Sequence, residues 1–288
     1  MDRRPSLVSV IIPAHNSQGE IGRQLEAIGR QTYRGGLEVI VADNNSQDGT
    51  ESAVLDWENG IESLKLVRAT DGRGVSYARN RGVEVAGGDL FVFCDSDDVV
   101  DGGWLEAMVD AATSMDLIGG RIKPFIDPRS AVSKAYYPSP ENGLRVACDF
   151  WPFATGASFG IWRDVLTELG GWDESFKTSE DVELSWRARM RGYSLGFAGD
   201  AVIVKRGRAD LRSFVRQQFQ WGRGNALLFK RYGHLGMRRP RLLRVWKRLL
   251  IDLPSVIGSD IERIRWLGRV AYRAGRLAGS SRYRVFFP

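Results

Sequence analysis

The sequence predicts an α/β fold in which a mainly parallel, Rossmann-like sheet is flanked by helices. In the first hundred residues, apolar runs rich in β-branched residues alternate with segments of helical periodicity. Strands and helices in this order form βαβ units, whose strands lie parallel. Three of these runs end in polar side chains, and ligands of such sheets bind at the carboxyl ends of the strands. We therefore expect a binding site along one edge of the sheet.

Four strands and three helices are expected in the first half of the chain. The strands cover residues 7–14, 37–42, 64–68 and 90–94, because these runs are mostly apolar. The helices cover residues 17–31, 48–57 and 74–86. Asn16 or Ser17 can cap the first of these helices.

The second half of the chain is less regular. Residues 127–140 predict a loop with three prolines, and residues 154–160 predict a turn because they are small. Helices are expected at residues 162–169, 180–190 and 211–231, and a strand at residues 193–204. Gly170 and Gly171 indicate the end of the first of these helices.

The composition restricts the kind of site. Cys94 and Cys148 do not form a C-x-x-C pair, so we expect a reducing compartment. With only His15 and His234, a zinc site is not expected, and a bound metal would rely on carboxylates, which favours Mg²⁺ or Mn²⁺.

The first six residues lack the apolar core of a signal peptide, and no run of 18 apolar residues occurs, so we expect neither a leader nor a membrane span.

Basic residues are concentrated after residue 237. Residues 238–288 contain 13 Lys or Arg and 3 acids, a net charge of +10, whereas the whole chain carries +6. We therefore predict a main domain at residues 1–237 and a basic helical tail at residues 238–288.

The tail is expected to form two amphipathic helices. Their apolar faces comprise Leu242, Val245, Trp246, Leu249 and Leu250 in the first and Ile264, Leu267, Ala271 and Ala274 in the second. Such helices with arginines on the other face are typical of attachment to an anionic membrane surface. The alternative, that the apolar faces pack on the domain, stays open. Nucleic acid is not an expected partner, because no motif for binding it is visible.

The acidic cluster Asp95-Ser96-Asp97-Asp98 follows the fourth expected strand. Three carboxylates at one strand end repel each other unless a cation joins them, and a divalent ion prefers oxygen ligands. An Asp-rich turn is the alternative. The apolar strand before the cluster favours a cation site, because such a strand places the acids at the edge of the sheet where ligands bind.

Two other segments near this edge carry polar side chains. Asp43 follows the second strand and can accept hydrogen bonds from a nucleobase or ribose, or can cap the next helix. Arg79 and Arg81 lie on an expected helix. Arginine binds diphosphates well, but a solvated helix face explains Arg81 equally.

Candidates also occur in the second half of the chain. Glu180, Asp181 and Glu183 lie at the start of a helix, where acids also favour the helix dipole. Gln217 and Trp221 lie on a long helix, where they can bind sugar hydroxyls and rings or pack against neighbours.

Taken in order, the motifs resemble family 2 glycosyltransferases of the GT-A fold. The resemblance covers about residues 8–231 and rests on VSVIIPAHN, EVIVADNNSQDGT, GVSYARNRG, DLFVFCDSDD, GGWDESFKTSEDVELSWR and QQFQWGRGNA. It implies inverting, metal-dependent transfer of one sugar from a nucleotide diphosphate sugar to an acceptor hydroxyl. The acceptor is expected to be a lipid-linked or cell-envelope glycan.

The resemblance also implies a role for each matching residue. The nucleotide would be bound by Pro13, His15, Asp43, Arg79 and Asp95. Asp97, with Asp95, would hold Mg²⁺ or Mn²⁺ as a DXD motif, and Asp181 would be the catalytic base. The donor and acceptor sugars would contact Asp98, Trp172, Asp173, Glu180, Gln217 and Trp221.

Two departures from the family pattern affect these expectations. Gln220 replaces the arginine of the Q-x-x-R-W motif, which favours transfer of a single sugar over polymer synthesis. Lys205 or Arg206 stands where many relatives place a histidine; a cation there can neutralise the leaving diphosphate but cannot bind metal.

We expect a cytoplasmic protein, peripheral on the inner face of the cell membrane. A sugar-phosphate nucleotidyltransferase and a non-catalytic sugar-nucleotide-binding partner are the alternatives.

Overall fold

The computed structural model describes residues 3–57, 60–135, 142–253 and 258–288, with the backbone alone at 244–246 and 248. The chain forms two compact units. The sheet unit comprises Met1–Lys123, Ser139–Arg145 and Pro152–Lys205, and the helical unit comprises Pro124–Pro138, Val146–Trp151 and Arg206–Pro288. The predicted boundary between residues 237 and 238 separates a transferase domain from an attachment tail. This division assigns a different function to each part of the chain, and it stays a prediction.

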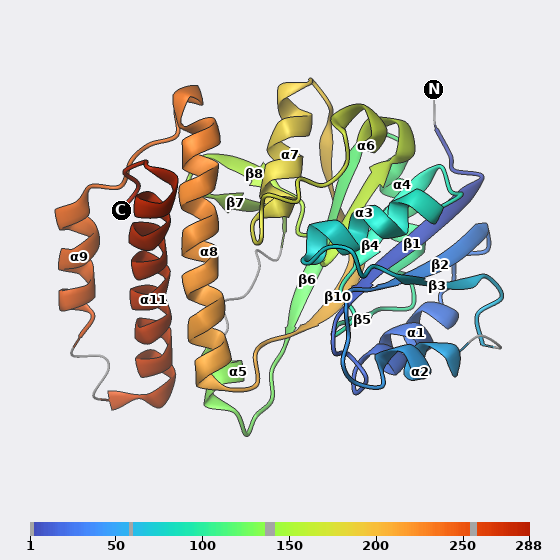
Figure 1. The fold of residues 1–288 in the computed structure, drawn as a ribbon, viewed down its shortest axis with the longest axis horizontal. Coiled ribbons are helices and arrows are strands. Elements are labelled where there is room, and N and C mark those ends of the chain that lie inside the picture. The colour runs from blue at the N-terminus through green and yellow to red at the C-terminus, as the bar shows by residue number, and fades with distance from the viewer. Residues whose placement is uncertain (1–2, 58–59, 136–141, 254–257) are drawn as a thin grey trace. The chain divides into compact units, whose positions relative to one another are not determined.

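An eight-stranded sheet in the order β3-β2-β1-β4-β9-β6-β10-β5 forms the centre of the sheet unit (Figure 1). The strands are β1 (Leu7–Ala14), β2 (Gly36–Asp43), β3 (Leu64–Arg68), β4 (Leu90–Cys94), β5 (Val99–Val100), β6 (Leu117–Phe125), β9 (Ser158–Trp162) and β10 (Leu195–Arg206). The first four in this order pair in parallel, whereas β9 is antiparallel to β4 and β6. The predicted α/β class is confirmed, and its parallel part consists of the strands expected from the first hundred residues.

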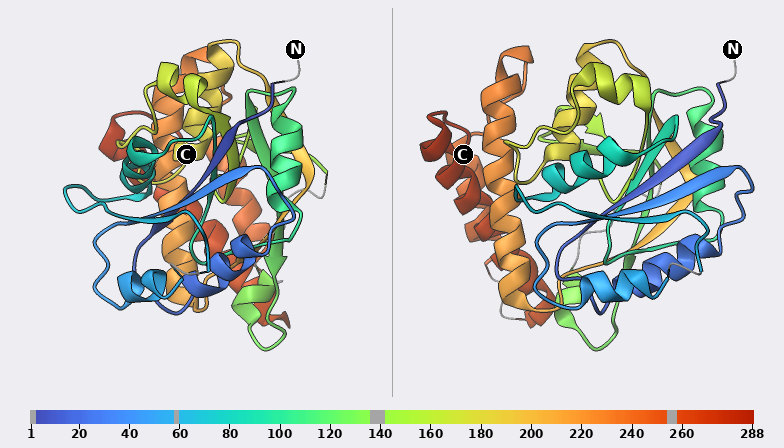
Figure 2. Two further views of the ribbon diagram at one scale, coloured as in Figure 1. Left: turned by 90° about the vertical axis from the view of Figure 1, so that its right-hand side faces the viewer. Right: turned by 45° about the vertical axis from the view of Figure 1, so that its right-hand side comes forward.

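Helices cover both faces of the parallel strands. They are α1 (Ile21–Gly29), α2 (Thr50–Leu55), α3 (Val75–Val85), α4 (Trp104–Ala112), α6 (Arg163–Leu169) and α7 (Glu180–Met190). α1 and α2 lie side by side along one face and α3 along the other (Figures 1 and 2). Gly82 lets α3 approach the sheet, because a Cβ there would lie 2.6 Å from Ile11 Cγ2. This crossover arrangement brings the ends of β1, β2 and β4 to one edge.

Three local predictions were wrong. Residues 154–160 are not only a turn, because β9 begins at Ser158 and lies between β4 and β6. Small residues are needed there because the interior is crowded: a Cβ on Gly160 would lie 3.0 Å from Met108 Cε. The loop at 127–140 contains a short helix, α5 (Ala131–Ala135), and residues 136–141 lie outside the described part. Neither Asn16 nor Ser17 caps α1, which begins at Ile21.

The helical unit is built around α8 (Leu211–Tyr232) and α11 (Asp260–Tyr283), which lie side by side (Figure 1). Its other elements are α5, the 3-10 turn η1 (Gly233–Leu235) and α9 (Leu242–Ile251). The paired short strands β7 (Arg145–Ala147) and β8 (Trp151–Phe153) contain residues of both units. Glycines set the helix spacing. A Cβ on Gly222 would lie 1.9 Å from the Tyr272 carbonyl oxygen, and one on Gly275 would lie 2.0 Å from that of Phe219. The two backbones therefore touch.

The two tail helices differ in how they bury their apolar residues. Ile264 and Ala271 of α11 are buried, as its contact with α8 requires. On α9, Leu249 is buried but Leu250 is 70% exposed, so the predicted apolar face is split. The side chains predicted on that face at positions 245 and 246 lie outside the described part. Within the described residues, no helix has the length and apolar character needed to cross a bilayer.

Candidate active site

The carboxyl ends of β1, β2 and β4 meet at one edge of the sheet, as the sequence predicted. Ala14 at the end of β1 is paired with Asp43 at the end of β2, and Ile11 of β1 is paired with Phe93 of β4. Asp95 follows β4 by one residue. The three polar segments predicted to converge therefore begin at the same level of the sheet.

The acidic cluster after β4 has the geometry of a cation site. Asp95, Asp97 and Asp98 each offer an oxygen, and these three atoms lie within 4.8 Å of one another. Asp98 is 1% exposed, and this burial raises the pKa of its carboxyl to about 7 against the lowering effect of Lys205. Oxygen donors of this kind fit Mg²⁺ or Mn²⁺.

Lys205, at the end of β10, lies among these carboxylates. Its Nζ donates to Asp95 Oδ2 and to Asp98 Oδ2, each at 2.9 Å. The ammonium thus joins two of the three acids and offsets part of their repulsion. The sequence identified Lys205 only as a replacement for an expected histidine. Its contact with the cluster depends on the antiparallel strand that brings it there.

Side chains of the loop after β1 and of α1 hold the acidic segment in place. Ser17 Oγ lies 2.8 Å from Ser96 Oγ. Gln24 is fully buried; its Nε2 donates to the Asp95 carbonyl at 3.2 Å, and its Oε1 accepts from the Val100 amide at 3.0 Å. The acids are therefore fixed by buried hydrogen bonds rather than carried on a mobile turn.

Arg79 of α3 links the acidic cluster to the start of α7. Its side chain is 2% exposed, and its guanidinium donates to Glu180 Oε1 at 2.9 Å and to Asp95 Oδ1 at 3.3 Å. The guanidinium lies over the Trp172 ring, with Cζ 4.4 Å from the ring centroid. In this structure the side chain binds other groups of the protein. Its contact with the diphosphate of a donor stays a prediction.

Gly156 connects the same arginine to Asp181. Its carbonyl accepts from Arg79 at 3.2 Å, and its amide donates to Asp181 Oδ2 at 3.0 Å. A Cβ at this position would lie 2.6 Å from Arg79 Nη2. Sequence reasoning missed Gly156, although the run of small residues around it was the available signal.

The acids at the start of α7 have different environments. Burial raises the pKa of Glu180 to about 7, and the nearby Asp181 adds to this effect. Burial also raises the pKa of Asp181 above its ordinary value, although the Gly156 amide opposes the shift. Glu183, in contrast, is fully buried in an ion pair with Arg187 at 2.8 Å, so it stabilises the helix. A raised carboxyl pKa in a candidate site is typical of a catalytic base.

The end of β2 connects to the loop before α3. Asp43 is buried and accepts a hydrogen bond from Ser46, so it does not cap α2. Asn44 donates to the Ala69 and Gly72 carbonyls at 2.6 and 2.9 Å. This network shapes the edge at which a nucleoside was predicted to bind.

The predicted nucleotide residues of β1 lie at the same edge. Pro13 is buried within the strand. His15 is exposed, and its Nδ1 lies 2.8 Å from the Asn44 carbonyl oxygen. Their contacts with a nucleotide stay predictions.

The segment before α7 packs against α3. Trp172 is 2% exposed and contacts Phe93 edge to face, with ring centroids 5.0 Å apart. Asn80 donates to its carbonyl and accepts from its amide, at 3.0 and 2.9 Å. Asp173 is half-buried beside it and accepts from the Ser175 amide at 2.8 Å. In this structure Trp172 supports Arg79, and a contact of either residue with an acceptor stays a prediction.

Two predicted sugar-binding residues belong to the helical unit. Gln217 and Trp221 are half-buried on α8, one turn apart. Gln220, which replaces the arginine of the family motif, accepts from Arg223 at 3.3 Å. The roles of Gln217 and Trp221 stay predictions.

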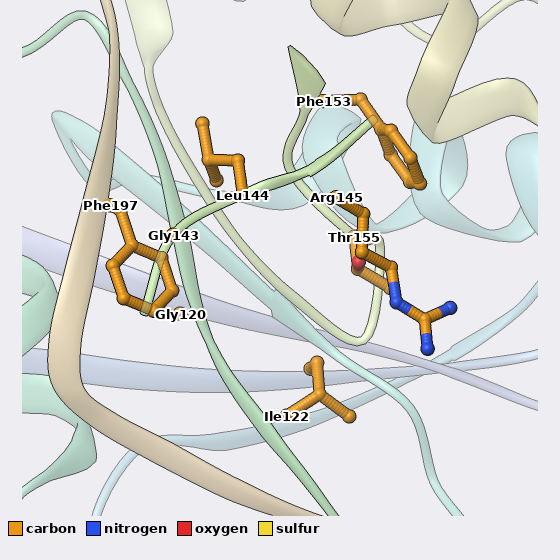
Figure 3. Close-up of a pocket in the computed structure, with 8 residues that line it drawn as sticks. All are labelled: Gly120, Ile122, Gly143, Leu144, Arg145, Phe153, Thr155 and Phe197. Carbon is orange, nitrogen blue, oxygen red and sulfur yellow. The ribbon is translucent and has the colours of Figure 1, made fainter. Parts of the chain in front are cut away.

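A small cavity in the sheet unit is lined by residues of β6 and β10 and of the segments at 143–145 and 153–155 (Figure 3). Its volume is about 10 Å³, and Ile122, Phe153 and Phe197 contribute to its lining. A space of this size holds about one water molecule. It is therefore too small for a nucleotide sugar.

Comparison with known proteins shows the family of the chain. The sequence model for Glycosyl transferase family 2 matches residues 9–170, more than half of the chain, and that for Glycosyl transferase family group 2 matches residues 90–278. The chain belongs to glycosyltransferase family 2. The prediction of a glycosyltransferase is thereby confirmed.

The similar proteins are also glycosyltransferases. Glycosyltransferase AglE of Haloferax volcanii is 28% identical, over 94% of this chain and 95% of its own length. The glucosyl-dolichyl phosphate glucuronosyltransferase of the same organism is 27% identical, over 74% and 72%. The chain spans only about three fifths of two other curated relatives, 60% and 59% of their lengths.

A solved structure supports the GT-A fold. The mannosyltransferase PcManGT from Pyrobaculum calidifontis, in complex with GDP-Man and Mn²⁺, superposes with a TM-score of 0.68 at 20% identity. The match covers 96% of this chain and 87% of that chain. At this identity the likeness shows the fold alone.

Proposed function

We propose that this family 2 glycosyltransferase moves one sugar from a nucleotide diphosphate donor to an acceptor hydroxyl, with inversion at the anomeric carbon. The observation that carries the proposal is the continuous network that joins the acidic cluster to Asp181. Arg79 contacts Asp95 at one end, and Gly156 contacts both Arg79 and Asp181 at the other. The network supports a donor site and a proton acceptor built as one rigid unit.

In this proposal Asp181 is the base. Its carboxylate takes the proton from the acceptor hydroxyl while the hydroxyl oxygen attacks the anomeric carbon. The bond from that carbon to the diphosphate breaks, and the nucleoside diphosphate leaves from the opposite face. Attack opposite the leaving group inverts the centre through an oxocarbenium-like transition state. The raised pKa of Asp181 supports this role, because a raised pKa makes the carboxylate a stronger base.

Asp97 and Asp95 would hold a divalent cation, and the three clustered oxygens fit that role. Such an ion would offset the charge of the diphosphate. Lys205 competes for the same Asp95 and Asp98 oxygens, at 2.9 Å. We infer that Lys205 holds the acids together before the donor arrives and then faces the leaving diphosphate. Charge stabilisation by such preorganised groups is commonly a large part of catalysis.

The acceptor is proposed to be a lipid-linked or cell-envelope glycan. The name of one similar protein specifies a glucosyl-dolichyl phosphate acceptor, which supports this proposal. Attachment of the basic tail to the inner face of the cell membrane would bring the enzyme to such an acceptor. Pro13, His15 and Asp43 are proposed nucleoside contacts. Asp98, Glu180, Trp172 and Asp173 are proposed on the sugar side, together with Gln217 and Trp221.

The proposal is tested by binding of nucleotide sugars to wild type and Asp97→Asn, measured by thermal shift with and without Mn²⁺. Wild type should be stabilised by its donor only when Mn²⁺ is present, and Asp97→Asn should lose most of this effect. Asp101→Asn is the control, because that exposed aspartate lies outside the cluster. Equal stabilisation of the wild type and Asp97→Asn would overturn the metal role.

A further inference from the structure

The helical unit contains a cavity that the proposed transfer reaction does not use. Its volume is about 600 Å³. Four of the side chains that line it are arginines, Arg238, Arg239, Arg241 and Arg276, and one is an acid, Asp149. The volume is within the usual range of sites for small molecules. The charge of its lining indicates an anionic ligand.

Two of these arginines are fixed by an aromatic stack. Phe229 of α8 and Phe287 lie face to face, with ring centroids 4.5 Å apart and planes at 11°. Arg239 lies over Phe229 with Cζ 5.2 Å from the ring centroid, and Arg276 lies over Phe287 at 4.5 Å. Such stacking uses the face of a guanidinium and leaves its N–H edge to donate.

The stack is itself held by the chain after α11. Arg284 adopts a left-handed conformation with φ of 53°, which ends the helix and turns the chain back. The Phe287 amide then donates to Ser280 Oγ at 3.0 Å, and Ser280 Oγ donates to the Phe287 carbonyl at 3.2 Å. The position of Phe287, and of the arginines beside it, is therefore built into the fold.

Asp149 is the one acid among the residues that line the cavity, so it offsets only part of the charge of the four arginines. Arg238, Arg239 and Arg241 are exposed, and the described residues offer them no ion pair. Arg276 donates to the Tyr272 hydroxyl at 3.1 Å and to the backbone oxygen of Pro288 at 3.4 Å. Four like charges around one cavity repel each other unless an anion joins them. Phosphate oxygens suit this site, because guanidinium groups bind them in bidentate fashion.

An exposed apolar face begins next to the cavity. α9 starts at Leu242, directly after Arg241. Leu243, Leu250 and Ile251 are 85%, 70% and 64% exposed. Their spacing of seven and eight residues puts them on one side of the helix, which also carries the exposed Lys247. A ligand with a phosphate and an apolar chain matches both features at once.

We propose that this cavity binds the phosphate group of an anionic membrane lipid, whose chains lie against the exposed face of α9. The inference rests on the proposed attachment of the tail to a membrane and names the site that performs it. Phosphate binds the four arginines, and the apolar face of α9 enters the bilayer surface. Interfacial helices combine these two contributions in the same way.

The experiment compares wild type with R238Q/R239Q/R241Q in sedimentation with vesicles at physiological ionic strength. The vesicles contain phosphatidylcholine, with or without phosphatidic acid. Wild type should bind those with phosphatidic acid and not the neutral ones. Because each basic group near such a surface contributes about 1 kcal/mol, the triple variant should bind roughly a hundredfold more weakly.

The matched control is R129Q/R212Q/R216Q. It removes the same charge from exposed arginines of the same unit. Arg216 and Phe229 are 13 positions apart on α8, about 20 Å of helix, which exceeds the Debye length of about 8 Å. The control should bind nearly as wild type does. An equal loss in both variants would overturn the site in favour of general surface charge.

A second pair of measurements separates lipid from free phosphate. Leu243→Ser with Leu250→Ser should weaken vesicle binding about tenfold or more and leave binding of soluble glycerol phosphate unchanged. Glycerol phosphate that binds as tightly as the vesicles would overturn the lipid assignment, and duplex DNA that binds as tightly would overturn it in favour of nucleic acid. None of these measurements needs sugar transfer, so transfer from a nucleotide sugar to a soluble acceptor tests the proposed reaction separately.

Discussion

In the sheet unit, two basic side chains bind three carboxyl groups of the candidate site, whereas in the helical unit four arginines line one cavity with a single aspartate. The three are Asp95, Asp98 and Glu180. Arg79 and Lys205 lie among them in contacts of 2.9 to 3.3 Å. The cavity arginines at positions 238, 239 and 241 are exposed.

The difference follows from burial. A charge that is buried when the protein folds needs a partner within the fold, because its desolvation is costly. An exposed charge is solvated and needs none. The acidic site is therefore organised in advance by its own cations, and the basic cavity leaves its charge for a ligand. Four predictions test this comparison.

The largest effect is expected for Asp181→Asn, which keeps the size of the side chain and removes its basicity. Loss of a general base typically costs 10²- to 10⁴-fold in rate, so kcat for transfer should fall about a thousandfold. Donor binding should stay within about twofold, because the change leaves the cation cluster intact. Steady-state kinetics and donor titration measure the two effects. Asp101→Asn, an exposed aspartate outside the proposed site, is the control, and unchanged turnover of Asp181→Asn would remove the base assignment.

Arg79→Ala should have the next largest effect, by breaking the internal balance of charge. It removes the cation that Glu180 and Asp95 share, and it removes the guanidinium that lies over the Trp172 ring. Loss of one partner from a buried pair costs about 3 to 5 kcal/mol, so the free energy of unfolding should fall by that amount in denaturant titrations. Arg81→Ala, two residues away in an exposed pair with Glu84, should cost under about 1 kcal/mol. Equal losses would contradict the role of burial.

The pH dependence of transfer should show the raised pKa of Asp181. The base acts as a carboxylate, so activity falls when the pH decreases through its pKa. Because burial raises that pKa, the acidic limb of kcat should lie above the ordinary aspartate value of about 3.9. Below its midpoint, activity should fall about tenfold per pH unit. Activity that stays level down to pH 4 would show that no such group acts in the reaction.

The smallest effect is expected for the stability of R238Q/R239Q/R241Q. Its exposed like charges have no ion pair within the described residues, so their removal relieves repulsion and costs only the stacking of Arg239 on Phe229. The free energy of unfolding should stay the same or rise by up to about 0.5 kcal/mol. Chemical denaturation measures this change against wild type. A loss of 2 kcal/mol or more would show that the cavity arginines support the fold, as Arg79 is expected to do in the sheet unit.

The sequence alone determined the parallel half of the sheet and the acids at its edge. Strands β3 and β4 and helix α7 have the predicted limits, because each is a local run whose pattern stands out from its neighbours. The rule that ligands bind at the carboxyl ends of strands then predicted the common edge of Asp43 and Asp95.

Only the tertiary structure decided the partners of these acids. Gly156, Lys205 and Gln24 reach the edge from three separate elements, and no local pattern indicates that they meet there. β9 was missed for a related reason, since its small residues are required by crowding in the sheet interior and resemble a turn in sequence.

In the tail, too, some features could be predicted from the sequence and others depend on packing. Its composition predicted a basic, amphipathic surface, because net charge and helical period can be read from the chain. The cavity could not be predicted, since it depends on Phe287 turning back onto Phe229 and on glycines that bring α8 against α11. Periodicity assigns residues to a face of one helix. The packing of separate elements decides which charges are neutralised and which can still bind a ligand.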